Sequence, residues 1–228
     1  ILVVDDSALL RRVECDIINS DNKFKVTDTC KDGLEALEKL RTKKYDGVVL
    51  DINMPRMDGL ELLQQLQKEK IKANIVMAST LTVEGANEAI KSLELGAIDF
   101  VTKPSNIIEA KGDAFKKALL DVLYAATKAR VHFKKPSMVV AADKTAAASV
   151  NRLKKPGQNK IIAIASSTGG PKALQSVIPK IPADIDAPVV LVQHMPAGFT
   201  RSMAARLNEL SKVQVKEAED GELLKKGV

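Results

Sequence analysis

Acidic residues at the ends of apolar runs form the first group with recognisable chemistry. Asp5 and Asp6 follow an apolar run at the start of the chain, and Asp51 ends a second such run. Neighbouring carboxylates repel one another unless a cation joins them, and their oxygen atoms suit Mg²⁺. Lys103 follows another apolar run and is suited to pair with a phosphoryl oxygen. These residues predict a Mg²⁺-dependent phosphoryl-transfer site in which Asp51 is the nucleophile.

Three further residues complete this predicted site. Ser79 ends an apolar run, where its hydroxyl is placed to bind a second phosphoryl oxygen. Asn53, two residues after Asp51, is expected to add its backbone carbonyl to the metal ligands. Pro104 is expected to turn the chain after Lys103 through a cis peptide bond, so that the ammonium points inward.

A serine at a strand-to-helix turn and a histidine after the next strand form the second group. Residues 161–171 read I-I-A-I-A-S-S-T-G-G-P, a strand pattern followed by a glycine turn and a proline suited to a first helical turn. Ser167 would lie beside the free N–H groups of a helix N-terminus, which can stabilise an oxyanion. Such turns also bind phosphate or simply change direction, and a single histidine at a strand end is often structural. Together, Ser167 and His194 give a nucleophile and a base suited to acyl transfer.

Alternating strand and helix patterns must position the first group. Apolar runs that predict strands cover residues 1–4, 25–30, 46–51, 74–79 and 99–104. Amphipathic helices are predicted to begin near Ser7, Gly33, Gly59 and Val83, and a last one reaches about Arg130. Continuous β-branched runs suit strands that are buried on both faces. We therefore predict an α/β fold, a (βα)5 doubly wound domain over residues 1–125 with its site at the carboxyl ends of the strands.

A second α/β pattern follows a segment without periodicity. Residues 126–158 are rich in Ala, Lys and Ser and predict a linker. Later strands are predicted at 161–166, 187–193 and 213–218, and helices at 171–181 and 199–210. This pattern predicts a parallel, Rossmann-like domain over residues 159–228. Because no helix or strand finishes there, the domain is expected to continue beyond Val228.

Composition narrows the class of protein. The chain is 45% hydrophobic, yet no run approaches the ~20 apolar residues of a membrane span, and its start lacks the order of a signal peptide. We therefore expect a cytoplasmic protein without membrane insertion. The net charge of the chain is +6, and its basic excess lies in residues 104–160, where the scarcity of aromatic residues favours a basic linker over a nucleic-acid-binding arm. Cys15 and Cys30 lack metal-site spacing and are expected to be reduced thiols.

The motifs of the first group resemble those of two-component response-regulator receivers. V-V-D-D-S, D-I-N-M-P-R-M-D-G, M-A-S-T and D-F-V-T-K-P occur in that order within the first domain. The resemblance implies that Asp51 receives its phosphoryl group from a histidine kinase. It also implies that Ser79 and Phe100 form a hydroxyl and aromatic switch that repacks the neighbouring helix face.

The order of a receiver, a basic linker, I-A-S-S-T-G-G-P and V-Q-H-M-P-A-G-F-T is similar to the CheB family of chemotaxis protein-glutamate methylesterases. Members of this family hydrolyse γ-glutamyl methyl esters on methyl-accepting chemotaxis receptors, and many deamidate receptor glutamines. The resemblance implies that Ser167 is the nucleophile and His194 its base. It also implies a chemotaxis histidine kinase as phosphodonor and no cofactor for the ester chemistry.

The sequence departs from the family pattern in two ways. Ala165 stands where the family usually has Gly. The aspartate of the catalytic triad belongs to a late G-M-G-x-D-G motif that this sequence does not contain, and Asp220 lies in a different family segment. This chain by itself is therefore expected to be phosphorylated but nearly inactive as an esterase.

Two hypotheses follow for the role of the receiver. In the first, the unphosphorylated receiver covers the edge that carries Ser167 and His194, and phosphorylation of Asp51 releases it. The alternative to an esterase is a receiver fused to a non-catalytic output module that binds DNA or docks a protein. The basic linker is the best support for this alternative.

Overall fold

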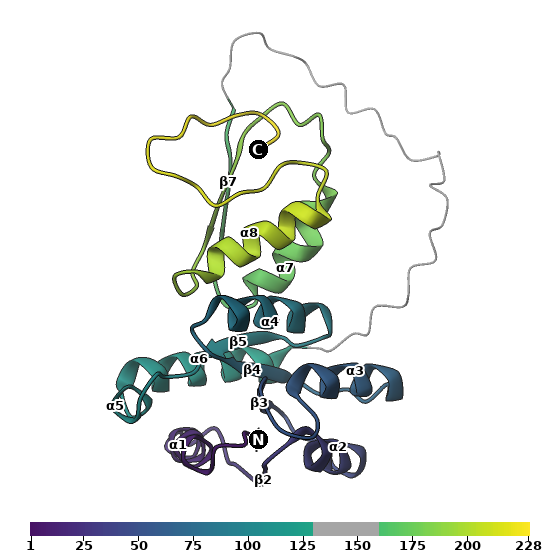
Figure 1. Cartoon of the computed structure of the whole chain (residues 1–228), viewed down its shortest axis with the longest axis vertical. Coiled ribbons are helices and arrows are strands. Elements are labelled where there is room, and N and C mark those ends of the chain that lie inside the picture. The colour runs from purple at the N-terminus through teal and green to yellow at the C-terminus, as the bar shows by residue number, and fades with distance from the viewer. Residues whose placement is uncertain (130–159) are drawn as a thin grey trace.

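The N-terminal half of the chain is a parallel sheet with helices on both faces (Figure 1). The structure is a computed structural model that describes residues 1–129 and 160–228. The strands are Leu2–Val4 (β1), Asp28–Cys30 (β2), Val48–Asp51 (β3), Ile75–Ser79 (β4) and Asp99–Thr102 (β5). The helices are Ala8–Asn19 (α1), Gly33–Thr42 (α2), Gly59–Glu69 (α3), Val83–Glu94 (α4), Ile107–Ala110 (α5) and Asp113–Lys128 (α6). The strand order β2-β1-β3-β4-β5 confirms the predicted doubly wound fold.

Alternate residues of each strand contribute their side chains to two hydrophobic clusters, one on each face of this sheet. Leu2 and Val4 pack in the cluster that α2, α3 and α4 cover, whereas Val3 packs in the cluster that α1 and α6 cover. Successive side chains of a strand point to opposite faces, so a central parallel strand must be apolar throughout. This requirement explains the continuous apolar runs of β1, β3 and β4.

Side-chain caps fix where four helices start. Ser7, Asp32 and Thr82 each accept a hydrogen bond from a backbone N–H in the first turn of α1, α2 and α4. Asp58 and Glu61 form a reciprocal capping box at the start of α3. Each cap satisfies an N–H group that would otherwise lack a partner. The helix starts predicted from the sequence are confirmed at Gly33, Gly59 and Val83 by their bounds.

The C-terminal region contains two parallel strands and two main helices. Its elements are Ile162–Ser166 (β6), Gly170–Val177 (α7), the 3₁₀ turn Ile178–Lys180 (η1), Val189–Gln193 (β7) and Phe199–Leu210 (α8). β6 and β7 pair in parallel with Ser166 opposite Gln193. The predicted parallel α/β class is therefore confirmed for this region as well.

Three sequence-based expectations differ from the structure or fall partly outside the described residues. Residues 213–218 do not form the predicted strand, because the N–H of Gln214 pairs with the carbonyl of Gly227 and not with a neighbouring strand. The peptide bond before Pro104 is not cis, since the described residues contain no cis peptide bond. Helix α6 continues to Lys128, and the predicted linker from residue 130 onward lies outside the described residues.

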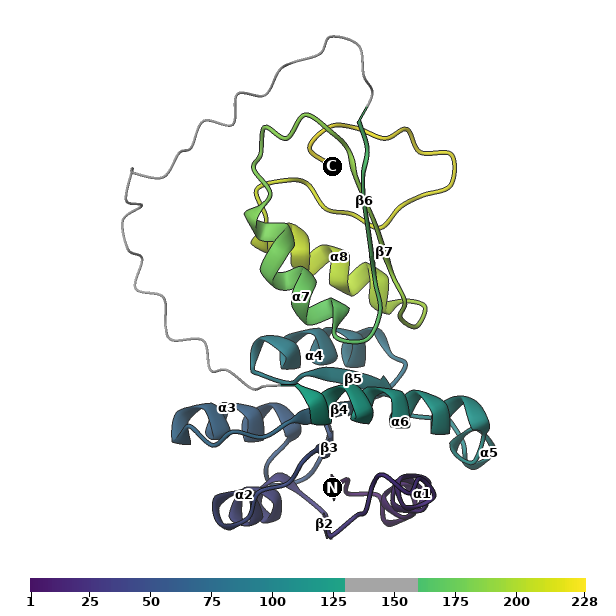
Figure 2. The same ribbon diagram turned by 180° about the vertical axis from the view of Figure 1, so that it is seen from behind.

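The two regions share one hydrophobic cluster across α4, α7 and α8. In both ribbon views α7 and α8 lie over α4, at the edge of the sheet formed by β5 (Figures 1 and 2). The rings of Phe100 in β5 and Phe199 in α8 stack with centroids 5.1 Å apart. Phe199 and Met203 are buried together with Ile90 and Leu93 of α4. Burial of this apolar surface holds the C-terminal region against the receiver fold.

Candidate phosphoacceptor and acyl-transfer sites

The three aspartates predicted from the sequence converge at the carboxyl ends of β1 and β3. Asp5, Asp6 and Asp51 each offer a carboxylate oxygen, and these oxygens lie within 4.8 Å of one another. Asp5 and Asp51 are buried, whereas Asp6 is exposed to solvent. Such a cluster of hard oxygen donors, open on one side, fits a divalent cation that keeps several waters.

Lys103 supplies the positive charge of this pocket. Its Nζ lies 2.7 Å from Oδ2 of Asp5 and 2.8 Å from Oδ2 of Asp51. Burial raises the pKa of the Asp51 carboxyl to about 6, and the Lys103 ammonium opposes this shift. The Asp51 carboxylate is thus costly to keep ionised without further positive charge, which a bound cation would supply.

The other predicted residues of the site take up definite positions. The Ser79 hydroxyl donates to the carbonyl of Gly85 in α4 at 2.7 Å, so it faces the first turn of that helix. Phe100 is buried in the neighbouring strand against α8. The side-chain amide of Asn53 approaches Glu88 at 3.5 Å, and the role of its backbone carbonyl as a metal ligand stays a prediction.

Glu14 is a buried carboxyl near this pocket that sequence reasoning missed. It lies in α1 and is 1% exposed, and its Oε2 has no hydrogen-bond partner. Burial, reinforced by the charge of Asp5, raises its pKa to about 8. A signal was present in the sequence, because Glu14 follows Val13 on the face of α1 that also carries Ile17.

Ser167 and His194 meet at the ends of adjacent strands, as predicted. They follow Ser166 and Gln193, which are opposite each other in the β6–β7 register. The Oγ atom of Ser167 lies 3.4 Å from Nδ1 of His194, and both residues are exposed. A long hydrogen bond is common in a catalytic pair before substrate binds.

The turn after Ser167 brings a backbone donor to the same place. Gly169 adopts φ +74°, a left-handed conformation that favours glycine, and α7 begins at the next residue. The N–H of Gly169 donates to Oδ2 of Asp99 in the receiver fold at 2.6 Å. The receiver therefore contacts the turn beside the pair, while Ser167 and His194 themselves stay exposed. The expectation that the receiver covers this edge is met at the start of α7 but not at Ser167 and His194 themselves, and its release by phosphorylation stays a prediction.

Gln193 is a second residue that sequence reasoning missed. Its side-chain amide bonds to the Ser166 hydroxyl and to the carbonyls of Ser167 and His194. The sequence shows that a glutamine precedes the histidine, but it does not show what the side chain contacts. Those contacts depend on the register between β6 and β7.

Comparison with known proteins gives two family matches that divide the chain as its fold does. Residues 1–111 match the response regulator receiver domain, and residues 162–228 match the CheB methylesterase family. The protein-glutamate methylesterase/protein-glutamine glutaminase of Halalkalibacterium halodurans is 43% identical over all of this chain and 64% of its own length. The chain belongs to the CheB family.

Two more known proteins are similar to this CheB-family chain. The Bacillus subtilis protein of the same name is 42% identical over 97% of this chain and 63% of its own length. The crystal structure of the response regulator domain of Thermotoga maritima CheB is 39% identical, covers 57% of this chain and 96% of that one, and has a TM-score of 0.48. The chain thus spans less than two thirds of the length of the curated relatives it matches.

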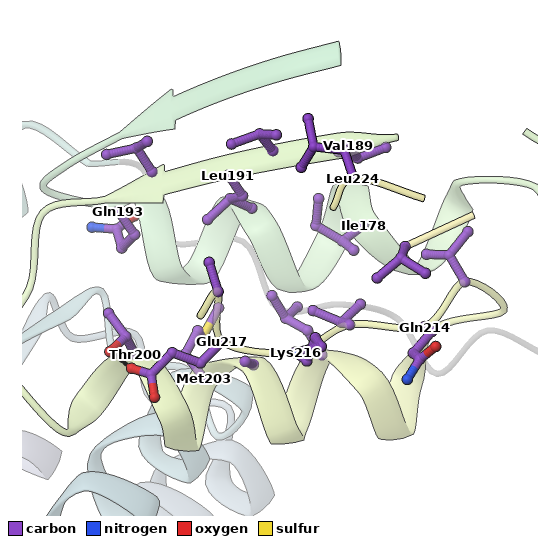
Figure 3. Close-up of a pocket in the computed structure, with 18 of the residues that line it drawn as sticks. Ile178, Val189, Leu191, Gln193, Thr200, Met203, Gln214, Lys216, Glu217 and Leu224 are labelled. Atoms are coloured by element: carbon purple, nitrogen blue, oxygen red, sulfur yellow. Dashed lines mark hydrogen bonds between the residues drawn. The ribbon is translucent and has the colours of Figure 1, made fainter. Parts of the chain in front are cut away.

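A cavity of about 410 Å³ in this CheB-family chain is lined by Gln193 and Met195, the two neighbours of His194 in the sequence. Figure 3 shows it between β7, α8 and the segment after α8, with Leu191 and Met203 among its apolar lining and Gln193 near one end. Thr200 and Glu217, which are hydrogen-bonded to each other, lie at its edge. Ser167 and His194 do not line this cavity, so we assign it no part in the chemistry.

Proposed function

We propose that this chain carries the receiver and the Ser167–His194 pair of a phosphorylation-regulated protein-glutamate methylesterase. The substrates would be γ-glutamyl methyl esters, and glutamines, on methyl-accepting chemotaxis receptors. The observation that carries the proposal is the 3.4 Å approach of Ser167 Oγ to His194 Nδ1 at adjacent strand ends. A hydroxyl and an imidazole in this arrangement form the nucleophile and base of acyl transfer.

The chemistry assigned to this pair is a two-step hydrolysis. Ser167 attacks the ester carbonyl of the receptor glutamate while His194 takes the hydroxyl proton. The intermediate then collapses, and the departing methoxide takes that proton from His194 and leaves as methanol. In the second step His194 takes a proton from water as its oxygen attacks the glutamyl–Ser167 ester, and the departing Ser167 oxygen then takes that proton from His194 as the glutamate is released. With a glutamine substrate the group that leaves in the first step is ammonia.

The receiver chemistry is assigned to the acidic pocket. Asp51 would attack the phosphoryl group of a phosphohistidine on a chemotaxis histidine kinase. Asp5, Asp6 and Asp51, with the backbone carbonyl of Asn53, would hold Mg²⁺, which neutralises phosphoryl charge. Lys103 stays paired with the phosphorylated Asp51. Ser79 would turn from the Gly85 carbonyl to bind a phosphoryl oxygen.

Regulation is assigned to the contact between Asp99 and Gly169. The N–H groups at the start of α7 are suited to stabilise an oxyanion, and Asp99 occupies one of them with a carboxylate. Asp99 precedes Phe100, the aromatic residue implied as the receiver switch. Repacking of Phe100 upon phosphorylation would withdraw Asp99 and free the Gly169 donor.

The setting follows from this function. None of the helices in the described parts of the chain has both the length and the apolar character needed to cross a membrane. We propose a cytoplasmic protein whose partners are a chemotaxis kinase and the receptors, with no nucleic-acid partner.

By itself the 228-residue chain should have little esterase activity, because the His194 ring has Ser167 as its hydrogen-bond partner and no carboxylate among the described residues. In serine proteases that defect lowers turnover roughly 10⁴-fold.

The test uses the chain extended C-terminally to the length of its relatives. Methanol release from membranes that hold methylated receptors is measured for the unchanged protein, for Ser167→Ala and for Ser176→Ala as the matched control on α7. The proposal predicts that release is lost in Ser167→Ala and kept in Ser176→Ala. Release that persists in Ser167→Ala would refute the site, and a steeply salt-dependent DNA affinity without release would favour the regulator alternative.

A further inference from the structure

The β6–β7 ladder ends immediately before the reacting groups. Ser166 lies opposite Gln193, and the N–H of His194 donates to the carbonyl of Ser166 at 3.0 Å as the last rung. Beyond this hydrogen bond, the segments that follow the two strands turn away from the ladder. Another interaction must therefore hold the two strand ends together where the pair is formed.

The side-chain amide of Gln193 provides that interaction. Its Nε2 donates to the carbonyl of Ser167 at 3.0 Å and to the carbonyl of His194 at 2.9 Å. Since carbonyls only accept, the amide nitrogen must face them, and Oε1 must face the Ser166 hydroxyl at 2.6 Å. The Ser166 hydroxyl is therefore the donor in this contact, and its bond sets the orientation of the amide.

The lack of a side chain at Gly170 gives independent support for this arrangement of Gln193 and Ser166. A Cβ atom at this position would lie 2.2 Å from Oε1 of Gln193 and 2.8 Å from Cβ of Ser166. Only glycine leaves room for the amide to sit against the turn. The two glycines of the turn thus have different roles, because Gly169 provides a left-handed backbone and Gly170 provides space.

We propose that Gln193 is a positioning residue that holds Ser167 and His194 at reacting distance, with Ser166 orienting its amide. The inference rests on the proposed esterase function. Gln193 has no role in the proton transfers themselves. It joins the backbone carbonyls of the two reacting residues through one amide group, so loss of the amide frees the strand ends to separate. Misplacement of reacting groups by about 1 Å can cost about 10²-fold in rate.

The experiment compares Gln193→Leu with Gln214→Leu in the chain extended to the length of its relatives. Gln214 is an exposed glutamine of the same region, so it is a matched control for the loss of an amide. Gln193→Leu is expected to lower kcat by about 10²-fold without raising KM, because receptor binding is not disturbed. Gln214→Leu is expected to keep both values. Equal kcat in Gln193→Leu and the unchanged protein would overturn the proposal.

A pH profile separates positioning from general structural damage. In Gln193→Glu the side chain keeps its shape, and when protonated it can donate one hydrogen bond to a carbonyl. Its kcat relative to that of the unchanged protein should therefore rise as the pH falls. A ratio that stays flat across pH would contradict the proposal.

Two further measurements keep the proposal testable if Gln193→Leu fails to fold or if the proposed esterase function is wrong. Ser166→Ala removes only the hydroxyl and is expected to lower kcat by about two- to tenfold. An unchanged kcat in Ser166→Ala would count against the proposal. If the unchanged extended protein shows no Ser167-dependent release, the proposed function fails. In that case proton exchange of the Gln193 side-chain amide in the 228-residue chain decides the geometry, since slow exchange supports the network and exchange at the rate of Gln214 refutes it.

Discussion

Asp99 in the receiver fold accepts a 2.6 Å hydrogen bond from the backbone N–H of Gly169, two residues after the proposed nucleophile. Asp99 is buried, and burial raises the pKa of its carboxyl, while the hydrogen bonds from Gly169 and Phe100 oppose the shift. A backbone donor suited to an oxyanion is thus already occupied by an acid from the regulatory half. This relationship links the two sites without covering Ser167 or His194.

Replacement of Asp99 tests this link. In the chain extended to the length of its relatives, Asp99→Ala is expected to raise methanol release in the absence of phosphodonor, because the Gly169 N–H becomes free. A coupling free energy of about 1 kcal/mol, at the low end of the usual range, would raise the rate of methanol release about fivefold. Asp121→Ala, an exposed change on α6, is the matched control and should leave the rate unchanged. An Asp99→Ala rate at or below that of the control would argue against the assignment.

Removal of the receiver is a coarser version of the same test. Deletion of residues 1–125 from the extended chain is expected to raise the basal rate as well. The deletion also uncovers Phe199, Met203 and Leu207, which are buried in a cluster shared with the receiver. Association of the remaining chain through that surface must therefore be checked by light scattering.

Phosphorylation of Asp51 can be tested on the 228-residue chain itself. With Mg²⁺ and acetyl phosphate, we expect an acid-labile phosphoryl group to form, and chelation of the metal should prevent it. Asp51→Asn should abolish labelling. Asp46→Asn, a change at an exposed aspartate before β3, serves as the control and should keep it. Undiminished label in Asp51→Asn would exclude this residue as the acceptor.

Stability without metal should depend on pH through Asp51. Its carboxyl has a pKa of about 6 in the folded chain, against an ordinary value of 3.8. As the pH rises between these values the unfolded state loses its proton first, so stability falls and the penalty is complete above pH 6. Asp51→Asn should therefore leave the free energy of unfolding unchanged near pH 3 and raise it by up to about 3 kcal/mol at pH 7.5. Urea unfolding in the presence of a chelator measures both values, and a gain that is independent of pH would contradict burial of the Asp51 charge as its cause.

Much of the fold was predictable because its signals are local. Buried parallel strands need continuous apolar runs, and helix starts need capping side chains such as Asp58, so both can be read from the sequence. The acidic pocket followed as well, since strand ends of a parallel sheet meet at one edge. The pairing of Ser167 with His194 was predicted by the same reasoning.

The features that were missed depend on contacts between distant segments. The role of Gln193 depends on the β6–β7 register, and that of Asp99 depends on how α7 packs against the receiver. Residues 213–218 have the alternation of a strand, yet alternation does not provide a partner strand, and Gln214 pairs with Gly227 instead. Such choices are made by tertiary packing, which a single sequence does not show.

The response of ester hydrolysis to phosphorylation tests the central claim most directly. Methanol release from methylated receptor membranes is measured for the extended chain with and without acetyl phosphate and Mg²⁺, alongside its Asp51→Asn and Ser167→Ala variants. We predict that the phosphodonor raises release in the unchanged protein, leaves Asp51→Asn at its basal rate and cannot restore Ser167→Ala. Release that is independent of Ser167, or a phosphodonor response that survives in Asp51→Asn, would contradict the claim.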